Sequence, residues 1–245
     1  MGPLRFAPGI DAAKFAPVFQ RFGRLHIPRI FPDEAAVAIG QALAGEATPW
    51  SNVFNSQGKI YDLKPDFQAS LDPKVRAELD AAIMAGARDG FQFRFDSWRL
   101  SDALERGERV GGEVAPIEEV WDFLNSSVFL DFARTLSGDP RIDNCDAQAT
   151  RYRAGDVLTT HDDLAEGKHR LLAYVLNFTP VWRVDWGGLL IFIDADGHVS
   201  EGYRPVFNAL NIFKVPQMHA VTQVAPFAGA DRLSVTGWVR AAGPL

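Results

Sequence analysis

The sequence predicts an α+β protein in which N-terminal helices pack against a jelly roll of antiparallel strands. The prediction rests on a change of pattern near residue 145. Before that point, alanine-rich and amphipathic segments follow helical spacing, whereas after it short β-branched and aromatic segments alternate with turn signals. Strands that succeed one another without intervening helices favour an antiparallel sandwich or barrel over an alternating α/β sheet.

The N-terminal part is expected to contain three helices, over residues 33–46, 72–90 and 116–138. Asp33 is the expected N-cap of the first helix, and Asp72 followed by Pro73 should open the second. Gly138 should end the third. Apolar stripes on the last two helices should face the core. They comprise Val75, Leu79, Ala82, Ile83 and Gly86 in one helix, and Ile117, Val120, Trp121, Leu124 and Val128 in the other.

One strand is predicted between these helices, over residues 90–100, where phenylalanines alternate with polar residues. The later strands are expected at 147–153, 157–161, 170–179, 188–194, 209–215, 220–224 and 232–240. We interpret residues 1–245 as a single domain. In this interpretation residues 1–146 supply mainly helical support and lid segments, and residues 147–240 form the jelly-roll core.

The composition places the chain among ordinary globular proteins. It has 245 residues, of which 47% are hydrophobic and 23% charged, so a sizeable core can form. The net charge of −6 gives no general attraction to nucleic acid or to an anionic membrane. One cysteine, Cys145, cannot form an intramolecular disulfide, and no secretory signal or membrane-length apolar run is present. We therefore expect a cytoplasmic protein, with monomer and homodimer both open.

A histidine and two acidic residues follow one another at the end of a predicted strand. His161 and Asp163 stand at i and i+2, so on a strand they would project from one face and leave Asp162 pointing away. One metal ion could be held by both. The triplet alone is weak evidence, since a polar strand end would look the same.

The third ligand must come from a distant part of the chain. Of the other histidines, His26 precedes the first predicted helix, and His169 and His198 fall in turns. His219 instead lies where one late strand gives way to the next, so its strand could run beside that of His161. Two histidines and one carboxylate form the facial triad of non-haem Fe(II) sites, which leaves coordination positions open for a 2-oxo acid and dioxygen.

An arginine suited to holding a carboxylate follows His219 along the chain. Arg232 offers a planar fork that matches a carboxylate and stays charged when buried. Ser234 and Thr236 should share its face of the strand. A half-buried arginine needs a partner. That partner could be a local carboxylate, Asp231 or Asp185, or the distal carboxylate of a bound 2-oxo acid.

These residues in this order resemble the Fe(II)- and 2-oxoglutarate-dependent dioxygenases. The H-x-D…H…R-x-S/T arrangement is similar to theirs, and the detail looks most like the prolyl 4-hydroxylase branch, especially the ribosomal-protein prolyl hydroxylases. The segments that carry the resemblance are ATRYRAGDVLTTHDD (149–163), WGGLLIF (186–192), FNALNIFKV (207–215) and RLSVTGW (232–238). The resemblance implies a double-stranded β-helix, the jelly roll of this family.

The resemblance also implies roles for individual residues. His161, Asp163 and His219 would bind Fe(II), and Arg232 would pair with the distal carboxylate of 2-oxoglutarate. Positions implied to lie near the co-substrate are Tyr152, Asn177, Ser234 and Thr236. Asn177 departs from the family, which usually has a tyrosine there that donates to the distal carboxylate. An amide can still donate a hydrogen bond.

The implied reaction is hydroxylation of an unactivated C–H bond, most simply in a prolyl residue of a protein or peptide, or in free proline. It would consume 2-oxoglutarate and O2 and release succinate and CO2, with ascorbate as a candidate reductant. Substrate would lie near 51–63 and 95–113, which we interpret as polar lid loops. Two alternatives stay open: the same chemistry on a non-prolyl small molecule, and a catalytically silent jelly-roll binding module.

Overall fold

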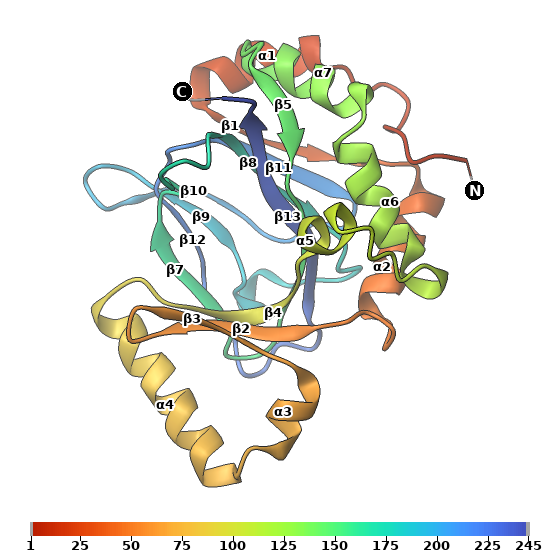
Figure 1. Cartoon of the computed structure of the whole chain (residues 1–245). Helices are drawn as coiled ribbons and strands as arrows, with labels where there is room; N and C mark the ends of the chain where they lie inside the picture. The colour runs from red at the N-terminus through yellow and green to blue at the C-terminus, as the bar shows by residue number, and fades with distance from the viewer. Residues whose placement is uncertain (1, 244–245) are drawn as a thin grey trace.

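Figure 1 shows the computed structural model, which describes residues 2–243 and contains one large sheet that curls into a nearly closed barrel. Neighbouring strands of the 13-stranded sheet follow the order β1-β11-β8-β13-β6-β4-β7-β12-β9-β10. Off this path, β2 pairs with β4 and with β3, and β5 pairs with β13. Every pairing between strands is antiparallel. The expected α+β jelly roll with supporting helices is therefore confirmed.

The first part of the chain contains helices and strands in alternation. Its elements are α1 (Ala12–Phe22), β1 (Arg24–Pro28), α2 (Asp33–Ala44), β2 (Ser51–Ser56), β3 (Lys59–Leu63), α3 (Pro65–Ser70), α4 (Pro73–Asp89), β4 (Phe93–Trp98), α5 (Leu100–Glu105), α6 (Ala115–Leu124), α7 (Ser127–Ser137) and β5 (Ile142–Cys145). The second part is nearly all strand. Its strands are β6 (Gln148–Tyr152), β7 (Val157–His161), β8 (Arg170–Asn177), β9 (Leu190–Ile193), β10 (Val199–Tyr203), β11 (Ala209–Lys214), β12 (His219–Val221) and β13 (Arg232–Ala241).

Side chains on β8 alternate between two cores, as strand geometry requires. Leu172, Tyr174 and Leu176 point outward and join the large hydrophobic core beneath the helices. Ala173 and Val175 point inward and pack with phenylalanines inside the barrel. The outer core fixes the sheet against α1, α2, α6 and α7 (Figure 1).

The predicted helices form, with three corrections. Helix α2 begins at Asp33 itself, so the cap position is Pro32, whereas the Asp72 side chain does cap α4 by accepting from the Lys74 amide. The segment 116–138 is two helices, because the Ser126 side chain caps a new helix, α7. Val128 then lies outside the core, 56% exposed.

Helix α4 also contradicts its predicted stripe. Of the five stripe residues only Ile83 is buried, and Val75 is 49% exposed. The helix packs against β2 and β4 and projects away from the barrel together with α3 and the β2–β3 hairpin (Figure 1). A helix that touches the body along one narrow line buries little of its apolar face.

Several strands have no counterpart among the predicted ones. These are β1, β2, β3, β5 and β10. The supposed lid loop 51–63 is a hairpin, whose turn uses Gln57 and Gly58 with positive φ. The supposed loop 95–113 begins inside β4 and continues through α5. Among the described residues, none of the helices combines the length and apolar character needed to cross a bilayer.

Candidate metal and co-substrate site

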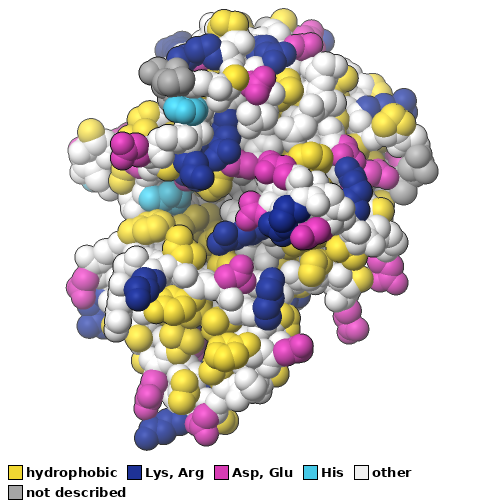
Figure 2. Space-filling view, viewed as in Figure 1, with side chains coloured by type: hydrophobic (Ala, Val, Ile, Leu, Met, Phe, Trp, Pro, Cys, Tyr) yellow, Lys and Arg dark blue, Asp and Glu magenta, His cyan; other side chains and the backbone are white. Residues whose placement is uncertain are grey.

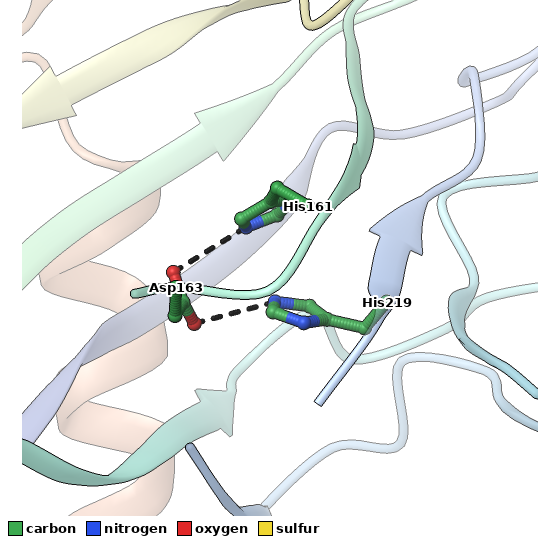
Figure 3. Close-up of side chains that lie close together, drawn as sticks. All are labelled: His161, Asp163 and His219. Carbon is green, nitrogen blue, oxygen red and sulfur yellow. Dashed lines mark ion pairs between the residues drawn. The ribbon is translucent and has the colours of Figure 1, made fainter. Parts of the chain in front are cut away.

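Two neighbouring strands bring the two candidate histidine ligands together. Strands β7 and β12 are paired with His161 directly opposite His219. The Nε2 atom of His161 lies 3.4 Å from Asp163 Oδ1, and the Nε2 atom of His219 lies 3.4 Å from Asp163 Oδ2 (Figure 3). The three ligand atoms lie within 4.8 Å of one another. Two imidazole nitrogens and one carboxylate oxygen are the donor set that suits a non-haem Fe(II) ion.

Backbone carbonyls fix the tautomers of both histidines. The Nδ1 atom of His161 lies 2.9 Å from the carbonyl oxygen of Thr159, and Nδ1 of His219 lies 2.7 Å from that of Gln217. A carbonyl can only accept, so each Nδ1 must carry the hydrogen. Both Nε2 lone pairs are then free for a metal, with the rings held in place by these hydrogen bonds.

Asp163 reaches the histidines by a route different from the predicted one. Strand β7 ends at His161, and Asp163 adopts a left-handed conformation with φ of 66°. The alternation of side chains along a strand therefore does not determine the direction of the Asp163 carboxylate. Aspartate is among the few residues that visit this conformation with some frequency. Asp162 is turned to the neighbouring backbone, where it accepts from the Leu164 amide.

The electrostatics of the triad favour metal binding at neutral pH. Burial alone would raise the pKa of Asp163, but the hydrogen bond to His161 and the electrostatic interactions with His219 and His161 bring it below its usual value. Burial, helped by the charge on His161, lowers the pKa of His219 to about 4. Near pH 7 the site therefore contains an ionised Asp163 carboxylate and a neutral His219. Neither group has to lose a proton before it binds a metal.

The low pKa of His219 should make the metal-free protein more stable as the pH rises. Between about pH 4 and 6.5 the unfolded chain binds a proton at this histidine and the folded chain does not, so the free energy of unfolding increases across that range, by roughly 3 kcal/mol at most. Urea unfolding at a series of pH values measures this slope. His219→Gln should flatten it, and His198→Gln, in an exposed turn, should not. An unchanged slope in His219→Gln would contradict the assignment.

Arg232 is buried without a carboxylate partner. It is 2% exposed at the start of β13, and among residues 2–243 no carboxylate lies within 4 Å of it. Asp185, one of the two local partners considered, pairs with Arg183 instead. The guanidinium stacks 5.2 Å from the Tyr152 ring, and its Nε atom has no hydrogen-bond partner. Burial lowers the pKa of Arg232, because the charged form is disfavoured away from water.

The neighbouring polar residues lie on the strands beside Arg232. Ser234 accepts from Arg232 at 3.3 Å and is 2.7 Å from the Thr150 hydroxyl. Asn177 lies directly opposite Ser234 across β8 and β13, is fully buried, and has no partner for its Oδ1. The Thr236 hydroxyl instead donates to the carbonyl oxygen of Tyr174. Arg232, Ser234 and Asn177 thus lie on one face, although the Asn177 amide nitrogen, like the Thr236 hydroxyl, already donates to backbone carbonyls.

Two neighbouring glycines allow close approaches of the chain at this end of the site. Gly188 has φ of 60°, and a Cβ atom there would lie 3.1 Å from Cδ of Arg232 and from the Trp182 ring. At Gly187, with φ of 66°, a Cβ would collide with the Gln223 carbonyl oxygen at 2.1 Å. The Trp182 indole donates to the Gly187 carbonyl. Gly188 therefore lets the chain pass close to Arg232, and Gly187 lets it pass close to the Gln223 backbone.

Residues that sequence reasoning did not assign also surround the triad. The Phe91 ring, half exposed, lies 5.5 Å from that of His161, and Leu164 and Met218 are exposed neighbours of the other two ligands. Figure 2 shows hydrophobic side chains gathered beside histidine on this face. Arg170 contacts Asp163, and Trp238 packs on Arg170. None of these contacts has a sequence signature, because each joins segments that the fold brings together.

Comparisons with known proteins agree with this arrangement. Residues 147–240 match the family described as the 2OG-Fe(II) oxygenase superfamily. Prolyl 3-hydroxylase OGFOD1 of Mus musculus is 34% identical over 125 residues, a match that covers 47% of this chain and 22% of the mouse protein. The chain therefore spans about a fifth of that relative.

Solved structures show the same fold. A prolyl-4-hydroxylase of Pseudomonas putida superposes with a TM-score of 0.58 at 17% identity, covering 95% of this chain and 100% of that one. A prolyl hydroxylase of Trichoplax adhaerens, solved with a hypoxia inducible factor peptide fragment, superposes with a TM-score of 0.60 at 14% identity and covers 94% and 89% of the two chains.

Proposed function

We propose that this chain, a prolyl hydroxylase-like protein whose residues 147–240 match the 2OG-Fe(II) oxygenase superfamily, hydroxylates a prolyl group in a protein or peptide. When bound, Fe(II) with 2-oxoglutarate and O2 would supply the oxidation of an unactivated C–H bond, with release of succinate and CO2. His161, Asp163 and His219 would hold the metal. Ascorbate would serve as an added reductant.

The observation that carries this proposal is the buried, unneutralised Arg232. Burying a charged guanidinium without a neighbouring anion costs free energy, unless a bound ligand supplies that anion. The distal carboxylate of 2-oxoglutarate fits this need, since it can accept two parallel hydrogen bonds from the fork. Ser234, on the same strand, accepts from the guanidinium and helps to orient it. The Asn177 amide nitrogen donates at 3.4 Å to the carbonyl oxygens of Val175 and Ala209, so the expected donation from Asn177 to the co-substrate would have to replace these long hydrogen bonds.

The chain's own residues would also control access to the metal. The buried ring of Tyr152 lies below Arg232 and stacks on Phe95, so water is excluded from that side of the co-substrate. The exposed side of the triad is bordered by Phe91, Leu164 and Met218. An apolar border of this kind suits the ring of a prolyl group. The prolyl class of substrate is further supported by the name of the mouse relative.

The proposal is tested by a product screen. The protein is incubated with Fe(II), 2-oxoglutarate and ascorbate, and with free proline, prolyl peptides or ribosomal-protein fragments in separate reactions. Succinate and the gain of one oxygen atom by the substrate are measured by mass spectrometry. We expect both with at least one prolyl peptide. Turnover on non-prolyl small molecules alone would overturn the prolyl assignment. Binding of metal and 2-oxoglutarate without any succinate would favour the catalytically silent alternative.

A further inference from the structure

Arg170 lies directly behind the carboxylate ligand of the triad. It begins β8, and its Nη1 atom donates to the carbonyl oxygen of Asp163 at 2.9 Å. The same nitrogen lies 3.9 Å from Asp163 Oδ1. One guanidinium therefore contacts both the backbone and the side chain of the residue that bridges the two histidines.

The guanidinium is itself held in place by β13. Its Cζ atom lies 3.5 Å from the centroid of the Trp238 ring, so the planar group stacks on the indole face. The Trp238 amide donates to Asp146, and Asp146 also pairs with Arg240 at 3.1 Å. Arg240 is the residue opposite Arg170 in the strand pair. Arg170 thus has a fixed position before any metal binds.

Asp163 needs such support because the sheet does not provide it. The strand carrying His161 ends two residues earlier, and Asp163 adopts a left-handed backbone conformation that aspartate visits more readily than most residues but that is still less favourable than an extended one. Within residues 2–243, the carbonyl oxygen of Asp163 receives its hydrogen bond from Arg170. Without that hydrogen bond, the turn could adopt other backbone conformations. The carboxylate would then no longer be held facing both histidines.

We propose that Arg170 is a positioning residue that fixes Asp163 in its metal-binding conformation, an inference that rests on the proposed metal site. The charge on Arg170 makes the proposal sharply testable. A cation close to the carboxylate ligand repels a divalent metal, so removing it would tighten metal binding if charge were the only effect. Loss of positioning would weaken binding instead. The sign of the change in affinity therefore separates the two roles.

The experiment measures Mn(II) affinity by calorimetry, without co-substrate or substrate, since Mn(II) is a redox-stable substitute for Fe(II). Arg170→Met should bind Mn(II) about 10–100-fold more weakly than the wild type, as is typical when support behind a metal ligand is removed. The control is Arg183→Met, which removes an exposed arginine that pairs with Asp185 and contacts neither Asp163 nor Arg170. Its affinity should stay close to that of the wild type.

Affinity in Arg170→Met equal to or tighter than that of the wild type would overturn the inference and leave the proposed function standing. No Mn(II) binding by the wild type would overturn both. If circular dichroism shows that Arg170→Met is unfolded, Arg170→Lys is measured instead. Lysine keeps the charge but lacks the planar face that stacks on Trp238, so its affinity should also fall, and wild-type affinity in that variant would count against the proposal.

Discussion

Replacing Asp163 with alanine is expected to abolish the visible charge-transfer band that the wild type should give when mixed anaerobically with Fe(II) and 2-oxoglutarate. His161→Ala should do the same, because each change removes one of the three ligand atoms that lie within 4.8 Å of one another. Loss of support behind a metal ligand already costs about 10–100-fold in affinity, so loss of a ligand should cost at least the upper end of that range. Anaerobic titration followed by absorbance measures the effect.

The neighbouring residue provides a matched control for this change. Asp162→Ala removes a carboxylate one position away that bonds to the Leu164 amide and does not face the histidines. It should leave the charge-transfer band in place. His198→Ala, in the turn between β9 and β10, serves the same purpose for His161→Ala. A band that survives in Asp163→Ala, or disappears in Asp162→Ala, would refute the assigned ligand set.

Arg232→Met should abolish 2-oxoglutarate binding while Mn(II) binding persists. Breaking a buried charge pair by removing one partner costs about 2–5 kcal/mol, which corresponds to a loss of affinity from roughly 30-fold to several thousandfold. The stability of the ligand-free protein should move in the opposite direction. Because the guanidinium is buried without an anion, its removal should leave the melting temperature unchanged or raise it.

Thermal melts with and without 2-oxoglutarate measure both effects together. The wild type should gain stability from the co-substrate and Arg232→Met should not. Arg183→Met is the control, since that exposed arginine pairs with Asp185 and lies outside the barrel interior. Equal stabilisation of Arg232→Met and wild type by 2-oxoglutarate would show that another group holds the distal carboxylate.

The sequence was most informative where local pattern and tertiary structure coincide. The strand 157–161 was predicted with its observed bounds, and the H-x-D spacing led to the residues that meet His219. The physical reason for this contact nevertheless differs from the predicted one. The orientation of the Asp163 carboxylate depends on a left-handed turn and on Arg170, not on strand alternation. A contact between a turn and the start of the following strand produces no periodic pattern in the sequence from which it could be predicted.

The N-terminal part was predicted less well for two physical reasons. The amphipathic stripe of α4 suggested a buried face, but the helix touches β2 and β4 along a narrow line, so most of the stripe is exposed. The segment 116–138 has continuous helical periodicity, yet the Ser126 cap divides it in two. Hydrophobic periodicity predicts which face of a helix would be buried if another element packed against it. It does not predict whether such an element is present.

The direct pairing of His161 with His219 on adjacent strands makes their separation along the chain unimportant for the geometry of the site. Residues can be added to or removed from the turns between these strands, for example at Asp194–Gly197 between β9 and β10, without changing the distance between the two imidazoles. A slip of β12 by one residue against β7 would instead turn His219 to the opposite face of the sheet. Homologous chains can therefore differ widely in loop length and keep the same ligand geometry, provided that this strand pair keeps its alignment.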